Sequence, residues 1–204
     1  MAKGDSTELY MKFIGFDNRP VKGESTALII GVGGVANPLS LGFRPREMFE
    51  VDTFTLSAGS SLTSSPFAKQ FMQQGGDPKA IEELMARLGP APDESSMSPL
   101  QPVTFNRPID ASSPELLQNL IKGTGYQSAS LIKRKAAGRV GSGDVFLRVD
   151  FTNVLLTNIG WDEGDEVVEK TTFICNKVSL RYRKQEFDGS LGPVIQGLWE
   201  YKKN

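Results

Sequence analysis

The C-terminal third of this 204-residue chain alternates apolar and polar side chains, and this pattern constrains the fold more than any other feature. From position 145 the apolar members of the alternation are Val145, Leu147, Val149 and Phe151, and the polar members are Arg148, Asp150 and Thr152. A period of two is typical of a strand with one face against a core and the other face toward water. The segment is therefore predicted to be a half-buried strand.

More strands are predicted after it. A turn is expected at the acidic segment 161–166, followed by a separate strand at 167–175. The alternation returns at 178–182. The hairpin signal Asp188-Gly189-Ser190 then precedes a last strand at 194–202. Together these segments predict an antiparallel meander.

The N-terminal part adds two strands. Residues 9–14 alternate in the same way. A second strand starts at Phe49, but its apolar phase slips between Val51 and Phe54. The slip indicates either a bulge or a strand that is shared between two sheets.

One core helix is predicted between Ser113 and Gly123. Ser113 is expected to be its N-cap, Pro114 its first residue and Gly123 its C-cap. The apolar side chains expected on one face of this helix are Leu116, Leu117, Leu120 and Ile121.

Residues 57–102 differ from the rest, because they are rich in Ser, Gly and Pro yet contain a second capped helix pattern at 77–89. Ordering a helix of this length costs roughly 20 kcal/mol, which its four apolar side chains cannot offset, so it must dock on its own barrel or on a neighbouring subunit. The predicted fold is mainly β: a small antiparallel β-barrel or sandwich with one flanking core helix. It is expected to be a single domain over 1–204 with an insertion at 57–102.

The composition excludes several functions. The chain has no histidine and only one cysteine, Cys175, so no His-based catalytic pair, His-ligated metal or internal disulfide is possible. The net charge of -1 indicates no nucleic-acid partner. No segment approaches the ~20 apolar residues that cross a bilayer, and the polar N-terminus lacks the pattern of a cleaved signal peptide. Neither a cofactor nor an enzymatic activity is expected.

Several motifs have a functional and a structural interpretation. Residues 31–36 match the dinucleotide fingerprint G-x-G-x-x-A, but Pro38 and Pro45 prevent the helix that it needs, which favours an extended loop. The acidic cluster at 162–166 lacks the spacing of a calcium loop and is expected to be a solvated turn. The basic run at 133–135, with Arg139, is expected to be a solvated face or a subunit contact rather than a phosphate site.

Three basic residues recur on one strand face: Lys177, Arg181 and Arg183. They are predicted to line a lumen, to meet an acidic partner or to form an ordinary wet sheet face, and the sequence leaves these three alternatives open.

Four segments resemble one family, the Hcp (hemolysin-coregulated) tube proteins of type VI secretion systems. They are Tyr10–Phe16 with the "KGES" turn at 22–25, the passage from Val103 through Arg107-Pro108-Ile109-Asp110 to Ser113-Pro114-Glu115-Leu116, the closing strands at 145–156 and 178–190, and the ending with Trp199. Each motif is weak alone, and their order along the chain is the specific part.

The resemblance implies a β-barrel with a flanking helix, six subunits that close into a ring, and rings that stack into a tube. It also implies partners: the spike, the sheath, the baseplate and effector proteins. Such a protein is assembled in the cytoplasm and then secreted without a cleaved signal peptide. The long loop at 23–46 is expected to contact an adjacent subunit or ring through Leu28, Ile29, Ile30, Val32, Val35 and Leu39, so that deletion of 31–41 leaves a folded monomer.

Two alternatives remain, one that is also an assembly protein and one from a different class. A phage-type tail tube subunit would share the assembly, and a β-barrel binding protein would use the insertion helix as a lid over a ligand. An enzyme is the least favoured, because no pair of groups with acid and base roles is visible.

Overall fold

The computed structural model describes residues 7–29, 37–57, 100–135, 144–164, 167–185 and 191–200, without the side chains of 135 and 185. The chain forms two compact units, Met1–Thr55 with Pro102–Asn204, and Leu56–Gln101. In the second unit, the backbone N–H of Gln101 donates to the carbonyl of Ser57 at 3.0 Å. The helix expected at 77–89 lies outside the described residues, and the single domain with an insertion at 57–102 stays a prediction.

The described part of the first unit is mainly β, as the alternation predicted. Its elements are β1 (Thr7–Ile14), η2 (Pro38–Ser40), β2 (Phe49–Val51), β3 (Thr53–Thr55), β4 (Val103–Pro108), α3 (Ser113–Lys122), β5 (Tyr126–Lys135), β6 (Val145–Glu163), β7 (Val167–Gln185) and β8 (Leu191–Glu200).

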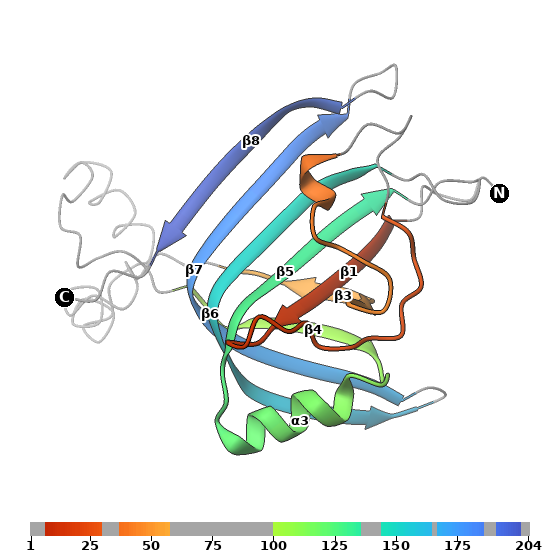
Figure 1. Ribbon diagram of the computed structural model, residues 1–204, viewed down its shortest axis with the longest axis vertical. Coiled ribbons are helices and arrows are strands. Elements are labelled where there is room, and N and C mark those ends of the chain that lie inside the picture. The colour runs from red at the N-terminus through yellow and green to blue at the C-terminus, as the bar shows by residue number, and fades with distance from the viewer. Residues whose placement is uncertain are drawn as a thin grey trace, which may run out of the picture. The chain divides into compact units, whose positions relative to one another are not determined.

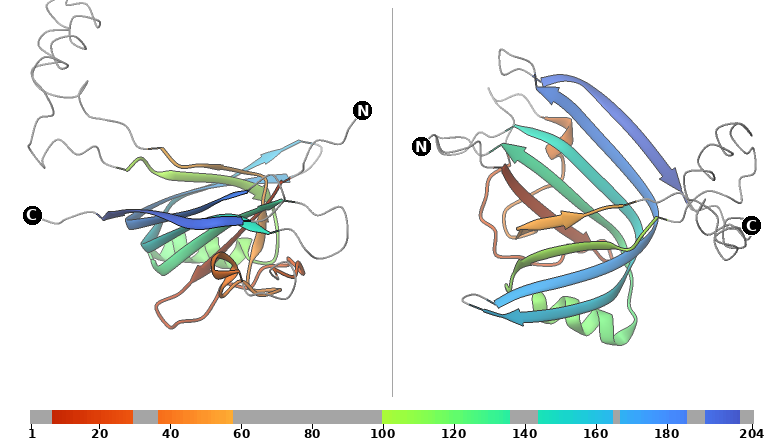
Figure 2. Two further views of the ribbon diagram at one scale, coloured as in Figure 1. Left: turned by 90° about the horizontal axis from the view of Figure 1, so that it is seen from above. Right: turned by 180° about the vertical axis from the view of Figure 1, so that it is seen from behind.

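The strands form a nearly closed barrel. Their order is β2-β1-β5-β6-β7-β4-β3, every neighbouring pair is antiparallel, and β8 pairs with β7 outside this path. The two ends of the order, β2 and β3, are separated along the chain only by Asp52, so one segment joins both ends of the sheet. The apolar slip after Val51 therefore marks a shared strand, the second of the two sequence interpretations. Seen from behind, β3 and β4 lie across the curved sheet formed by the other strands (Figures 1 and 2).

Aromatic rings fill the barrel interior. The ring centroids of Phe13 and Tyr126 lie 5.0 Å apart, as do those of Phe151 and Phe173, and Phe13 also stacks on Phe49 at 6.0 Å. All five side chains are buried. Since these rings come from strands far apart in the sequence, they hold the closed barrel together.

A second, smaller core lies between the barrel and the loop at 23–46. Its buried members are Tyr10, Leu39, Phe43, Met48, Ile132 and Val145. The buried Asn37 side chain supports the loop by donating to the carbonyl of Val145 at 2.9 Å. The described parts of the loop thus pack on their own barrel. A folded monomer after deletion of 31–41 stays a prediction, and the deletion would remove Asn37 and Leu39 from these contacts.

This outer core also corrects the predicted alternation of β6. The pairing of β5 with β6 shifts between Lys133 and Arg134, so that Arg134 lies opposite Val145. Val145 joins the outer core, while Phe151 packs against Phe173 inside the barrel. One irregularity in the pairing therefore sends two members of the same apolar series to different cores.

The meander is longer and less interrupted than predicted. The strands expected at 167–175 and 178–182 are one strand, β7, of 19 residues, and β6 has the same length. Residues 161–163, expected in a turn, are the end of β6. The first half of β7 pairs with β4 in the barrel, and its second half pairs with β8. We call the second half of β7 together with β8 the wing.

Helix α3 follows the prediction with two corrections. Gly123 adopts φ 65° and closes the helix, as expected of a C-cap glycine. The N-cap is Ser112 rather than Ser113. Of the four apolar side chains expected on the buried face, Leu116 is the one that is fully buried, and Ile121 is 75% exposed, so Ile121 does not belong to that face.

Candidate functional site: a buried arginine network and an exposed wing

The "KGES" turn passes so close to the chain before β2 that only glycine fits at position 23. A Cβ atom on Gly23 would lie 2.2 Å from the carbonyl oxygen of Met48. The backbone N–H of Gly23 instead donates to the carbonyl of Arg46 at 3.2 Å. The close approach fixes the direction in which the next residue, Glu24, leaves the turn.

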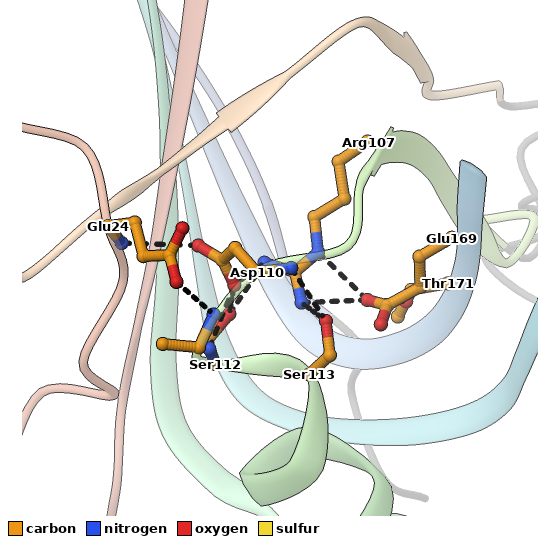
Figure 3. Close-up of polar contacts among 8 residues, drawn as sticks. Glu24, Arg107, Asp110, Ser112, Ser113, Glu169 and Thr171 are labelled. Carbon is orange, nitrogen blue, oxygen red and sulfur yellow. Dashed lines mark hydrogen bonds and ion pairs between the residues drawn. The ribbon is translucent and has the colours of Figure 1, made fainter. Parts of the chain in front are cut away.

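Glu24 joins this turn to the start of α3. Its backbone N–H donates to Asp110 Oδ2 at 3.2 Å, and its own Oε1 accepts from the backbone N–H of Ala111 at 3.1 Å. Two of the four segments that carry the family resemblance are thus bound to each other through residues that lie 86 and 87 positions apart in sequence (Figure 3).

The centre of the network is Arg107, whose side chain is fully buried. Its Nε and one terminal nitrogen both lie 2.8 Å from Glu169 Oε1, and the other terminal nitrogen donates to Asp110 Oδ1 at 2.8 Å. The hydroxyls of Ser112 and Ser113 accept from the same guanidinium (Figure 3). Arg107 therefore ties β4, β7 and the start of α3 together inside the barrel.

The network supports the structure through buried, paired charges. Glu169 is also fully buried, accepts from Thr171 at 3.2 Å through Oε1 and leaves its Oε2 without a partner among the described residues. The guanidinium of Arg107 further lies 4.1 Å from the ring centroid of Phe49. A buried charge is tolerated when it is paired and hydrogen-bonded in this way.

The apolar alternation of β4 contains a signal for the burial of Arg107. Val103, Phe105 and Arg107 alternate along β4, and all three are buried, so the arginine occupies an apolar position of the pattern. Its main partner Glu169 is 62 residues away in another strand. A local pattern can therefore indicate the buried cation but not its carboxylate.

The wing exposes apolar side chains. On the face that continues the barrel interior, Leu180 and Tyr182 are each 38% exposed, and Ile195, which pairs with Tyr182, is 61% exposed. On the other face, Val194 and Leu198 are 42% and 59% exposed. Within the described part of the chain, β8 pairs with β7 alone, so its other edge offers unpaired backbone groups.

The three predicted basic residues share one face of β7, and each has a partner there. Lys177 lies 3.3 Å from Glu200, Arg181 binds Asp150, and Arg183 donates to the carbonyls of residues 191 and 192. These contacts place the residues as a row on the wing but do not decide among a lumen, an acidic partner and a wet face.

Asp150 is the acidic centre of this face. It accepts from Ser130 at 2.7 Å and from Arg148 at 2.9 and 3.0 Å, besides its contact with Arg181. Burial alone would raise the pKa of Asp150, but the hydrogen bond from Ser130 and the two arginines outweigh burial and hold the pKa below its ordinary value of 3.8.

The loop residues predicted as ring contacts have different surroundings. Leu28 is 54% exposed, Ile29 packs partly against the outer core, and Leu39 is fully buried in that core. Ile30, Val32 and Val35 lie outside the described residues, as does the glycine motif at 31–36. Leu39 therefore supports its own subunit, and Leu28 is the described member of the set that is free to contact another chain.

The remaining sequence candidates are accounted for as follows. Arg134, expected on a solvated face or at a subunit contact, is instead buried, pairs with Glu8 at 2.6 Å and donates to the carbonyl of Leu28. Burial raises the pKa of the Cys175 thiol to about 11, which keeps it unreactive. Across the described ranges, no cluster of cysteine and carboxylate side chains could hold a metal ion, and no helix is long and apolar enough to span a membrane.

Comparison with known proteins decides the family. Residues 86–188, half of the chain, match the family described as "Type VI secretion system effector, Hcp". The chain belongs to the Hcp family. A relative, "Protein hcp1" of Pseudomonas aeruginosa, is 30% identical over 110 residues, which is 52% of this chain and 66%, just under two thirds, of that protein.

Solved structures agree at the level of the fold. A type six secretion system protein superposes with a TM-score of 0.65 at 18% identity, over 96% of both chains. Hcp1 from Salmonella typhimurium gives 0.57 at 14% identity, over 96% of this chain and 95% of that one. Hcp proteins are secreted, tube-type structural components of type VI secretion, and their family is not an enzyme family.

Proposed function

We propose that this Hcp chain is a subunit of the type VI inner tube: six copies close into a ring, rings stack, and the tube is expelled with effector proteins. It has no enzymatic activity of its own. Its partners are further copies of itself, the spike, sheath and baseplate proteins, and effectors.

The exposed wing supports this proposal most directly. A monomer that left Leu180, Tyr182 and Ile195 in water would lose the stabilisation that apolar burial provides. A neighbouring copy that covers this face and pairs with the free edge of β8 would bury both, at about 800 Å² per partner. Because the wing extends from one side of the barrel, such contacts between copies are head-to-tail. Head-to-tail contacts form a closed ring when the rotation from each copy to the next adds up to a full turn.

The barrel interior argues against the ligand-binding alternative. Aromatic side chains occupy it, among them Phe13, Phe105 and Phe173, whose rings contact one another. A barrel that binds a small ligand needs that space for the ligand instead.

The proposal is tested by the mass of the purified protein at micromolar concentration, measured by mass photometry and imaged by negative-stain electron microscopy. We expect six-fold rings for the wild type and monomers for Ile195→Lys. The control is Ile121→Lys, which places the same charge on an exposed isoleucine of α3 and should leave the rings unchanged. A wild type that stays monomeric, or rings that persist in Ile195→Lys, would contradict the proposed role of the wing.

We also propose that Lys177, Arg181 and Arg183 face the lumen of the ring, where they would meet acidic cargo surfaces. A reconstruction of the ring from the same grids tests this directly. Side chains found on the outer wall would make these positions an ordinary solvated or sheath-facing surface.

A further inference from the structure

A pocket of about 660 Å³ lies outside both the arginine network and the wing. The turn at 15–20 after β1, helix α3 and the start of β5 surround it. The end of β1 and the start of β5 lie beside each other because Ile14 pairs with Ser128, and Figure 1 shows both at the end of the barrel where α3 lies. Its volume is within the range of ~300–1,000 Å³ that is usual for ligand sites.

The pocket lining combines apolar and charged residues, and it includes an exposed aromatic ring. Phe16 is 64% exposed. A Cβ on Gly125 would lie 3.5 Å from Phe16 Cε2, so the ring rests close to the bare backbone of that glycine. Exposed aromatic rings beside a hollow are typical of surfaces that bind another protein.

One donor is fixed deep in the pocket. The Tyr126 hydroxyl accepts from Asn119 Nδ2 at 2.8 Å, which leaves its own proton available to an acceptor on a ligand. Burial raises the pKa of Tyr126 to about 12, so the proton is present at neutral pH. The side chain is 1% exposed, and its position is therefore set by the barrel and not by the ligand.

Several charged side chains line the pocket, and the Lys22 ammonium has no close ion-pair partner among them. Asp17 pairs with Arg19 at 3.6 Å. Glu115 lies in the first turn of α3, where the helix dipole favours a negative charge. Lys22 has only Glu47 at 3.9 Å, at the limit of an ion pair, and its side chain is 70% exposed.

We propose that this pocket binds a peptide segment of a partner protein that presents one bulky apolar side chain beside one carboxylate. The apolar side chain packs on Phe16 inside the pocket, the carboxylate binds the Lys22 ammonium, and a peptide carbonyl accepts from the Tyr126 hydroxyl. The inference does not depend on ring formation, because none of these residues belongs to the wing.

The test uses the full-length protein and a fluorescein-labelled peptide of sequence Gly-Gly-Ala-Phe-Glu-Ala, followed by fluorescence anisotropy. We expect saturable binding, at least ~10-fold weakening in Phe16→Ala and in Lys22→Ala, and the same weakening when Lys replaces Glu in the peptide. The matched controls are Ile121→Ala and Lys122→Ala, which remove an exposed isoleucine and lysine of α3 outside the pocket lining and should change nothing.

Absence of saturable binding up to millimolar protein, or equal loss in the control variants, would overturn the inference. Mass photometry of the same samples keeps the two proposals apart. Rings without peptide binding contradict the pocket alone, and peptide binding to monomers contradicts the tube subunit alone.

Discussion

Arg107 shows how one residue joins parts of the chain that are far apart in sequence. Its guanidinium binds Glu169 in β7 and Asp110 before α3, and Asp110 in turn binds the backbone of Glu24. A lysine in its place would offer a single point charge instead of a planar fork, so it could not serve these partners together. The arginine identity therefore follows from the geometry of the network.

Arg107→Met should lower the free energy of unfolding by about 3–5 kcal/mol, because it leaves the carboxylate of Glu169 buried and unpaired. Glu169→Leu should lower the free energy of unfolding by a similar amount, because it leaves the guanidinium of Arg107 buried without the carboxylate of Glu169. The double variant should lose less than the sum of the two, and urea denaturation of all four proteins measures this coupling. Strict additivity would mean that the pair does not act as a unit.

Asp150 makes the stability of the fold depend on pH in the acidic range. Its pKa is lowered in the folded chain, so the stabilisation is present above the ordinary value of 3.8 and is lost as the pH falls through the lower folded value. Asp150→Asn should therefore reduce stability at pH 6. In this variant the stability should also fall less steeply than in the wild type between pH 5 and pH 3. Thermal melts of the wild type and of Asp150→Asn across this range check it.

At the scale of elements, local patterns predicted most strands and α3, and failed where distant pairing decides. Nothing near residue 176 shows that β7 continues, since its continuity comes from pairing with β6 along almost all of its length. Val145 was assigned to the wrong core because a shift in the pairing with β5 is not visible in the alternation. In the loop at 23–46 the sequence showed the apolar residues but not Tyr10 and Ile132, the partners against which Leu39 packs.

The site was predicted less completely than the fold. The "KGES" turn and the passage around Asp110 were recognised separately, while their contact through Glu24 depends on how the barrel closes. The row on β7 was found because it is local to one strand. The pocket beside Phe16 was not found, since its lining comes from three separate segments.

Gly23→Ala tests the close approach of the turn to the chain before β2. The new methyl group would overlap the backbone carbonyl of Met48, so we expect a loss of about 1–3 kcal/mol or more in unfolding free energy. Gly160→Ala is the matched control, because a Cβ there meets nothing within 4 Å. Equal stability of the two variants in urea would show that the turn relaxes away from Met48.

At the scale of the whole molecule, the barrel closes without β8, since β8 lies outside the closed path. The barrel is therefore expected to fold without the β8 strand of the wing. Most of the stabilising aromatic contacts, such as those of Phe13 with Phe49 and Phe173, lie within the closed part.

A chain shortened to residues 1–190 should consequently still unfold cooperatively and should run as a monomer at micromolar concentration. Removing residues 1–14 instead takes away β1, which pairs with both β2 and β5, and should abolish cooperative unfolding. Circular dichroism melts and mass photometry distinguish the two truncations. Rings formed by the 1–190 chain would show that β8 is dispensable for assembly.

The unbroken length of β6 and β7 has a mechanical consequence. Both strands run from the closed barrel into the region of the wing, and they remain paired for almost all of their 19 residues. A pull along the strands would load their interstrand hydrogen bonds together in shear, rather than opening them one after another. When a subunit is held by its wing, a force along β6 and β7 is thus transmitted to the barrel through continuous backbone.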